Sequence, residues 1–380
     1  MKYTTKAAEK STVKITIKFD GEEWKAAQTK AYMKARGRFA INGFRKGKAP
    51  KNVIENVYGK GVFYEDAIND LLPEAYEAAA KESELEIVGN PEFDIVSIGE
   101  YAFEGCTSLT SVTLSDSIVS IRSGAFKGCT ALTSVTFGNG LTVIGNEAFS
   151  GCTSLTIVTI PDNIESIGDS AFRGCTSLEN ITIPEGVKKI GNHAFRFCSA
   201  LTEIVIPNTV TSIGTSAFAF CERLTTITLP TGLTRLNDWV FARCESLAEL
   251  DIPNRVTRIG DHAFSGCKSL KKLTLPERLN QIGSYAFSCC DNLTDITIPE
   301  KVSALSQGVF SYCGSLRNIV LPENLISLGA HAFKNCTALA SVVLPAGVTA
   351  IESETFCGCT GLRNIIIPET CTTIDPTAFK

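Results

Sequence analysis

Residues 144–161 read Ile-Gly-Asn-Glu-Ala-Phe-Ser-Gly-Cys-Thr-Ser-Leu-Thr-Ile-Val-Thr-Ile-Pro, one copy of a unit that fills about three quarters of the chain. Its phenylalanine, Phe149, returns every 23 residues without insertion or deletion, thirteen times from Phe103 to Phe379. A fixed period of this length is typical of a solenoid, in which each repeat forms one coil and buries its apolar side chains against its neighbours.

Positions within the unit are counted from the repeated Phe. Leu stands at plus six in twelve copies, and plus nine and plus eleven are aliphatic or Phe, as in Val158 and Ile160. This alternation predicts a short strand with inward-pointing side chains, and Pro at plus twelve ends the strand in ten copies. We expect about twelve such strands to form one parallel sheet on the concave face of the solenoid.

The chain has 15 cysteines, and twelve of them stand at plus three, from Cys106 to Cys359. One cysteine per coil at a constant position predicts a ladder of small, reduced core side chains. The Ala-Phe-x-Gly-Cys and Ile-Pro signatures resemble those of the BspA-like group of leucine-rich repeat proteins. The resemblance covers residues 95–380 and implies a leucine-rich-repeat solenoid, and members of that group are often surface adhesins.

The first ninety residues have no such repeat, and residues 1–60 carry fifteen Lys or Arg against five Asp or Glu. Alternation predicts a strand at 11–19. Ala-, Lys- and Glu-rich composition predicts a helix at 22–39, and shorter apolar patterns predict helices at 51–58 and 62–81 and a strand at 85–95. We therefore expect an α+β domain over residues 1–94, joined to the solenoid without a flexible linker and capping it.

Between the first two predicted helices lies Gly43-Phe44-Arg45-Lys46-Gly47-Lys48-Ala49-Pro50. This loop resembles the signature of the N-terminal domain of bacterial trigger factor, and the resemblance extends over about residues 10–94. It implies docking on the large ribosomal subunit through Gly43, Phe44, Arg45 and Lys46, to which we add the neighbouring Lys48. An exposed Phe among cations suits such a contact. In the alternative, Phe44 packs back onto its own domain.

The chain departs from trigger factor after this domain, because the 23-residue repeat begins at once. Neither the isomerase domain nor the helical chaperone domain of that family fits here, so their activities are not implied.

On the solenoid, two places break the repeat pattern. Plus two is usually Gly but is Phe197 and Phe220 in adjacent coils, which form either an apolar patch for a partner or extra core. The strand positions that face solvent carry Glu203, Glu249 and Asp251, which predict a mildly acidic surface suited to a basic peptide or protein. We take these five residues as a candidate partner surface.

Arrangements for catalysis or cofactor binding are missing from the sequence. The three histidines lie three coils apart, and no Ser-His-Asp arrangement, phosphate loop or metal-ligand cluster is found. We expect no enzyme activity, no cofactor and no metal.

Residues 1–20 lack the apolar segment of an export signal, and no run of eighteen apolar residues predicts a membrane span. These features favour the cytoplasm. The first hypothesis is therefore a ribosome-associated, chaperone-like scaffold whose solenoid recognises a protein or peptide. The alternative is a cell-surface or host-interacting repeat protein whose N-terminal domain is only a cap.

Overall fold

A computed structural model describes residues 2–7, 13–18, 21–58, 62–82 and 96–380 of the chain. The chain folds as two compact units, a small N-terminal one and a large C-terminal one. The predicted strand at 85–95, and with it the predicted junction between the two domains, lies outside the described residues.

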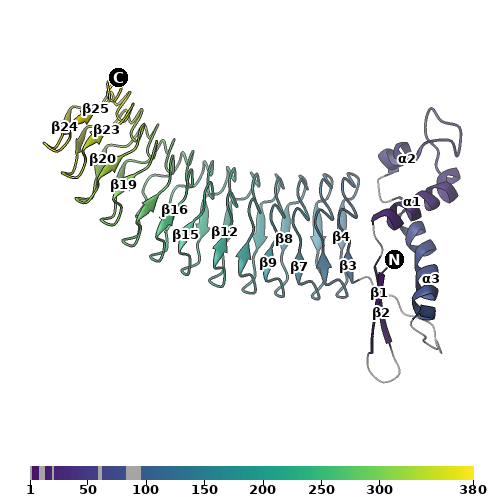
Figure 1. The fold of residues 1–380 in the computed structure, drawn as a ribbon. Coiled ribbons are helices and arrows are strands. Elements are labelled where there is room, and N and C mark those ends of the chain that lie inside the picture. Colours follow the sequence, from purple (N-terminus) through teal and green to yellow (C-terminus); the bar gives the residue numbers. More distant parts are fainter. Residues whose placement is uncertain (1, 8–12, 19–20, 59–61, 83–95) are drawn as a thin grey trace. The chain divides into compact units, whose positions relative to one another are not determined.

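The N-terminal unit contains a two-stranded antiparallel sheet and three α-helices (Figure 1). Its elements are β1 (Lys2–Ala7), β2 (Val13–Lys18), α1 (Gly21–Ala35), the 3-10 turn η1 (Arg36–Arg38), α2 (Lys51–Tyr58) and α3 (Tyr64–Glu82). The helices agree with the sequence prediction to within a few residues. Strand β1, which pairs with β2, was not predicted.

Small side chains let the helices of this unit approach one another. Ala27, Ala31 and Ala35 recur every fourth residue of α1 and form a buried cluster with Phe63 and Ala67. Three ion pairs between α1 or η1 and α3 add to this contact, namely Lys30–Glu74, Lys34–Asp70 and Arg38–Asp66. The loop at 41–50, which connects η1 to α2, is therefore carried by a packed helical support.

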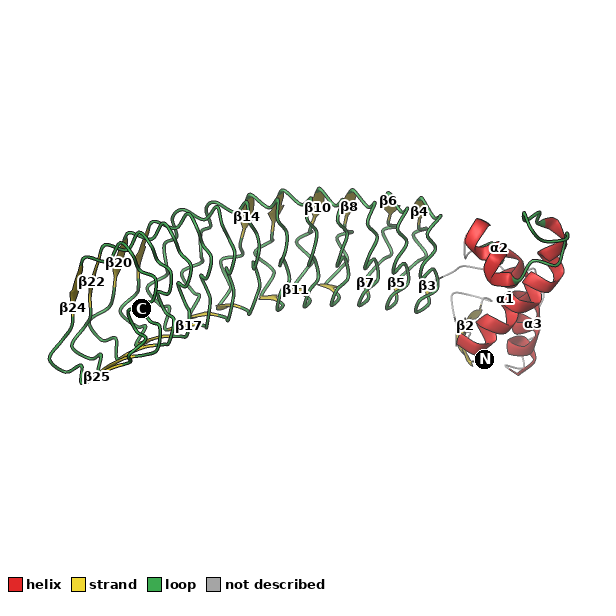
Figure 2. Cartoon of the chain, turned by 90° about the horizontal axis from the view of Figure 1, so that it is seen from above, coloured by secondary structure: helices red, strands yellow, loops and turns green. Residues whose placement is uncertain are grey.

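The C-terminal unit is a stack of coils with parallel strand pairing, which confirms the predicted parallel β-solenoid (Figure 2). Strands at plus eight to plus ten pair in parallel with a 23-residue register, as Ser111 with Ser134 and Val112 with Val135. These strands are β4 (Ser111–Thr113), β6 (Ser134–Thr136), β8 (Ile157–Thr159), β10 (Asn180–Thr182), β12 (Glu203–Val205), β14 (Thr226–Thr228), β18 (Asp295–Thr297), β20 (Asn318–Val320), β22 (Ser341–Val343) and β24 (Asn364–Ile366).

Each coil adds a second, two-residue strand, so two parallel ladders run along the solenoid where one was expected. The second ladder uses the aliphatic residue at plus eighteen. Its strands are β3 (Ser97–Ile98), β5 (Ser120–Ile121), β7 (Val143–Ile144), β9 (Ser166–Ile167), β11 (Lys189–Ile190), β13 (Ser212–Ile213), β15 (Arg235–Leu236), β16 (Arg258–Ile259), β17 (Gln281–Ile282), β19 (Ala304–Leu305), β21 (Ser327–Leu328), β23 (Ala350–Ile351) and β25 (Thr373–Ile374).

The repeated Phe, Leu and Cys residues fill the space enclosed by each coil. Successive Phe rings stack nearly parallel, for example Phe149 on Phe172 with centroids 5.4 Å apart. The thiols at plus three from Cys129 to Cys359 each donate to the carbonyl of the preceding coil's Phe, as Cys152 Sγ does to Phe126 O at 3.1 Å. The side chains that define the period are thus core, and variation is left to the surface.

The third side of each coil is a turn segment from minus three to plus three. Its backbone N–H groups at minus two, zero and plus two donate to carbonyls of the next coil, as His193 does to Thr215. From Tyr101 to Gly358, the residues at minus two and plus two have positive φ, whether or not they are glycine. These two positions point outward and form two rows along the solenoid.

Candidate functional site

Two consecutive turns build the basic loop of the N-terminal unit. The N–H of Phe44 donates to Ile41 O at 3.1 Å, and the N–H of Lys48 donates to Arg45 O at 2.9 Å. Gly43 and Gly47 occupy the third position of each turn with φ of +87° and +74°, where glycine is favoured because it has no Cβ. The glycines therefore fix the path of the loop.

Both ends of the loop are held by tyrosine hydroxyls. Tyr32 Oη on α1 donates to Ala49 O at 3.0 Å, and Tyr58 Oη on α2 donates to Ala40 O at 3.2 Å. The Tyr58 ring also packs against Phe39, with ring centroids 5.0 Å apart. The loop is thus a supported projection rather than a free segment.

The predicted docking residues lie on the outside of this projection. Phe44 keeps 43% of its surface exposed, which favours presentation to a partner over packing onto its own domain. Arg45, Lys46 and Lys48 are exposed as well. Among the described residues none of these three cations has an ion-pair partner, whereas Lys34 on α1 is paired with Asp70 at 2.6 Å. The loop cations are therefore free to meet an external anion.

Phe197 and Phe220 lie side by side in the plus-two row of the solenoid. Their rings are 4.7 Å apart at an angle of 33°, and both are half-buried. This partial burial lies between the two interpretations made from the sequence, an exposed apolar patch and extra core.

The predicted acidic residues belong to a different segment of the coil. Glu203 begins β12, and Glu249 lies in register with Lys272, which in turn lies in register with Asp295. Lys272 therefore separates two carboxylates of this row, and Asp251 lies two residues after Glu249 in the same coil. The phenylalanines stand on the turn segment and the carboxylates on the strand ladder, so the predicted surface consists of two separate parts.

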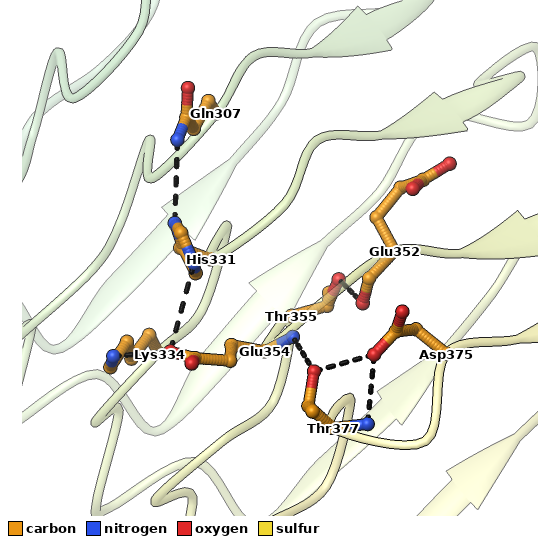
Figure 3. A network of polar contacts seen from close by, with 8 residues as sticks. All are labelled: Gln307, His331, Lys334, Glu352, Glu354, Thr355, Asp375 and Thr377. Atoms are coloured by element: carbon orange, nitrogen blue, oxygen red, sulfur yellow. Dashed lines mark hydrogen bonds and ion pairs between the residues drawn. The ribbon is translucent and has the colours of Figure 1, made fainter.

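In two coils, the cation at plus one forms an ion pair with a carboxylate of the next coil: Lys127 with Glu147, and Lys334 with Glu354. The second pair is part of a polar network near the C-terminal end of the chain (Figure 3). Lys334 forms an ion pair with Glu354, whose carboxylate also lies 3.6 Å from His331 Nε2. The hydrogen bond between Lys334 and Glu354 lowers the pKa of Glu354 and raises the pKa of Lys334. Gln307 and Thr377 extend the network to the coils on either side.

A shallow groove of about 520 Å³ follows the plus-two row further along the solenoid. Arg243, Lys268, Cys289, Tyr312 and Asn335 contribute to its wall. Arg243 and Lys268 both contact Glu245, at 3.4 and 2.9 Å, so that the groove carries mixed charge.

In the described part of the chain, no group of three or more His, Cys, Asp or Glu side chains is placed to hold a metal ion. No described helix is both long enough and apolar enough to cross a membrane.

One feature of the solenoid surface was missed from the sequence. Arg173 and Arg196 occupy plus one in adjacent coils, and the Arg196 guanidinium carbon lies 4.7 Å from the centre of the Phe197 ring and 5.4 Å from that of Phe220. The signal that could have revealed them is the residue twenty positions later, which is Glu for the paired lysines but His193 and Ser216 for these arginines.

Comparison with known proteins separates the same two regions. Residues 79–202, 188–316 and 304–380 match the BspA type leucine rich repeat region, and residues 1–112 match bacterial trigger factor protein. The trigger factor of Lachnoclostridium phytofermentans is 51% identical over 89 residues, which are 23% of this chain and 21% of that protein. The chain therefore spans about a fifth of the length of the curated relative it matches.

Solved structures resemble the solenoid. A leucine-rich repeat protein from Bacteroides ovatus is 28% identical, with a TM-score of 0.52 over 76% of this chain and 80% of that one. The pneumococcal vaccine antigen PcpA has the same TM-score at 21% identity, over 78% of each chain, which shows a shared fold alone.

Proposed function

The chain belongs to the BspA-type leucine-rich repeat family over residues 79–380, and from this premise we propose that it is a non-enzymatic protein-binding scaffold. Its N-terminal unit docks the scaffold on the large ribosomal subunit, in the cytoplasm. The solenoid then recognises a protein or peptide, such as an emerging nascent chain, in a chaperone-like role.

The observation that carries the docking proposal is the basic loop. Its segment lies in the part of the chain that is 51% identical to a trigger factor, and Phe44 is exposed among cations that have no described ion-pair partner. Free cations can meet ribosomal phosphates and carboxylates, and an apolar side chain at the centre of such a contact contributes strongly to affinity. Gly43 and Gly47 contribute by setting the turns.

Support for the scaffold proposal comes from the surface of the solenoid. The conserved period occupies the core, while the outward positions of the strands and turn segments vary from coil to coil. Stacked coils offer an extended surface of this kind in many repeat proteins.

Co-sedimentation with 70S ribosomes tests the docking proposal. The wild-type protein should pellet with ribosomes, and the variant Phe44→Ala/Arg45→Ala/Lys46→Ala should remain in the supernatant. A matched control is Lys271→Ala/Lys301→Ala, which removes the same charge from exposed, unpaired lysines of the solenoid. Pelleting of the loop variant at the wild-type level would show that the loop is not the docking site.

The second candidate is a cell-surface or host-interacting repeat protein whose N-terminal unit is only a cap. It is favoured by the membership in the BspA-type family, of which many members resemble surface adhesins. Fractionation of the native bacterium with an antibody against the solenoid separates the candidates. Protein in the cell-wall or secreted fraction favours the second, and protein in the ribosomal pellet favours the first.

A further inference from the structure

Two arginines in neighbouring coils stand at the same position of the turn segment. Arg173 and Arg196 both occupy plus one, and the coils that carry them are about 5 Å apart, the spacing of paired strands. Arg173 is exposed and Arg196 is half-buried. Neither has a carboxylate partner among the described residues. We call these two residues the arginine pair.

The rest of the solenoid shows how a cation at this position is normally compensated. Lys127 forms an ion pair with Glu147, and Lys334 does so with Glu354; in both, the carboxylate comes twenty residues later, at minus two of the next coil. At the corresponding places the arginine pair meets His193 and Ser216. The fold therefore has a position for an internal counter-ion, and here it leaves that position without one.

The aromatic rings beside the arginine pair are held in an unfavourable backbone conformation. Phe197 and Phe220 have φ of +65° and +63°, where a side chain costs about 1–2 kcal/mol per residue relative to glycine. The four preceding coils place glycine at this position, from Gly105 to Gly174. Glycine at this position would avoid the strain of the positive φ. That phenylalanine is present instead points to a role for the two aromatic side chains.

Two buried side-chain nitrogens at the arginine pair lack hydrogen bonds. Arg196 Nε and His193 Nδ1 are buried and have no hydrogen-bond partner among the described residues. Burial, followed by the charge of Arg173, lowers the pKa of Arg196. The pKa of His193 is lowered by burial and then by both arginines, although Asp169 opposes this shift. The cluster is thus a partly desolvated positive site, where an added anion is worth more than on open surface.

We propose that Arg173 and Arg196, together with Phe197 and Phe220, bind a carboxylate side chain flanked by an apolar residue in an extended segment of a partner protein. Two guanidinium groups one coil apart can both donate to the carboxylate, and the half-buried rings of Phe197 and Phe220 receive the apolar neighbour. This inference rests on the proposed scaffold function and names the chemistry of its ligand.

The charge of the remaining surface favours one carboxylate over a nucleic acid. From residue 95 onward the chain has twenty Lys or Arg against twenty-five Asp or Glu. Exposed Glu179 and Glu222 belong to the coils that carry Arg173 and Phe220, respectively. A polyanion would have to pass these carboxylates, whereas a single Asp or Glu side chain need not. This ligand differs from the basic peptide expected from the strand face, because the arginine pair lies on the turn segment.

Fluorescence anisotropy with labelled synthetic peptides tests the proposal on the full-length protein. The probe is a ten-residue peptide of alternating Glu and Leu, and the comparison peptides replace Glu by Gln or by Lys. Only the Glu peptide should bind wild-type protein. Arg173→Gln/Arg196→Gln should weaken its binding by at least about tenfold, because each lost charge-assisted contact contributes about that factor.

The chain supplies a matched control and a second probe of the rings. Arg255→Gln/Arg278→Gln removes the same charge from exposed arginines that also lie 23 residues apart, and it should leave binding unchanged. Phe197→Gly/Phe220→Gly restores the residue that other coils use and relieves the positive φ, so it should fold and still bind more weakly. Equal loss in the control pair, or no loss in the ring variant, would overturn the proposed site.

Other outcomes of the same titrations are decisive too. Binding of the Gln peptide as tightly as the Glu peptide would refute the role of the carboxylate, and preferred binding of a labelled poly-uridine oligonucleotide would show a nucleic-acid site instead. Ribosome pelleting distinguishes this inference from the docking proposal, since the arginine variant should pellet normally. If wild-type protein binds the peptide but does not pellet with ribosomes, only the ribosome-docking proposal is contradicted.

Discussion

Tyr285 and Gly308 form a pair across two coils that should be energetically coupled. Both stand at minus two, and a Cβ atom added to Gly308 would lie 2.2 Å from Cε1 of the Tyr285 ring. The substitution Gly308→Ala must therefore displace that ring. The ring stacks on His262 with centroids 5.1 Å apart, and His262 stacks on Trp239 at 3.9 Å, so displacement disturbs a column of three rings.

The cost of Gly308→Ala has two separable parts. The positive φ of +59° costs an Ala about 1 kcal/mol, and loss of the stacked position of the ring costs about 0.5–1.5 kcal/mol plus part of its burial. We expect about 2–3 kcal/mol in total. In the background Tyr285→Ser, which installs the residue found at this position as Ser170 and Ser216, only the backbone part of about 1 kcal/mol should remain.

Urea unfolding of the four proteins in this double-mutant cycle measures the coupling. Far-UV circular dichroism gives the free energy of unfolding, and fluorescence of Trp239 reports on the column of rings. Gly232→Ala is the control, because a Cβ there has nothing within 4 Å and φ is not positive. If Gly308→Ala costs the same in both backgrounds, within about 0.5 kcal/mol, the side chain of one coil does not restrict the next.

Three further predictions concern the core. Phe264→Ala, which removes a fully buried ring stacked between Phe241 and Phe287, should lower the free energy of unfolding by about 3–5 kcal/mol; Phe379→Ala, at a residue 45% exposed, should cost clearly less in the same urea titration. Burial raises the pKa of Cys221 from 9.0 to about 12. Above about pH 9, the thiol therefore ionises in the unfolded chain but keeps its proton in the native protein. The free energy of unfolding should fall between pH 9 and 12 by up to about 1.4 kcal/mol per pH unit for such a thiol. The urea midpoint should therefore drop from pH 8 to pH 10.5, less steeply in Cys221→Ala, and an equal slope in both proteins would contradict the assignment. Brief alkylation of native protein at pH 8, read by mass spectrometry, should modify the half-buried Cys357 and Cys371 before Cys221.

The solenoid could be predicted from sequence because its determinants are periodic. The repeated Phe, Leu and Cys mark the inward positions of every coil, and all the coils agree. Strand β1 was missed because the hairpin with β2 has no such repetition. The second ladder was missed because two-residue strands depend on the register of neighbouring coils, which a strand signal within one coil does not contain.

The surface was harder to predict because its contacts join one coil to the next. The order Glu249, Lys272 and Asp295 along the strand face follows from the constant period, and the structure has that parallel register. Arg173 and Arg196, in contrast, become notable only when the residue twenty positions later is compared with the Glu147 that pairs with Lys127. Comparing each plus-one residue with minus two of the following coil would have revealed them.

The backbone of the turn segment explains why variation collects in its two outward rows. Positive φ recurs at minus two and plus two from Tyr101 to Gly358, in the turn segments whose N–H groups donate to the next coil. The hydrogen bonds are made by the backbone, so they persist whether the residue is Gly174 or Phe197. A side chain there adds local strain without altering the ladder, and its loss to glycine leaves the core intact. We therefore expect substitutions at Phe197 and Phe220 to change the proposed binding while the period that stabilises the solenoid stays fixed, so that variants in this row separate binding from folding.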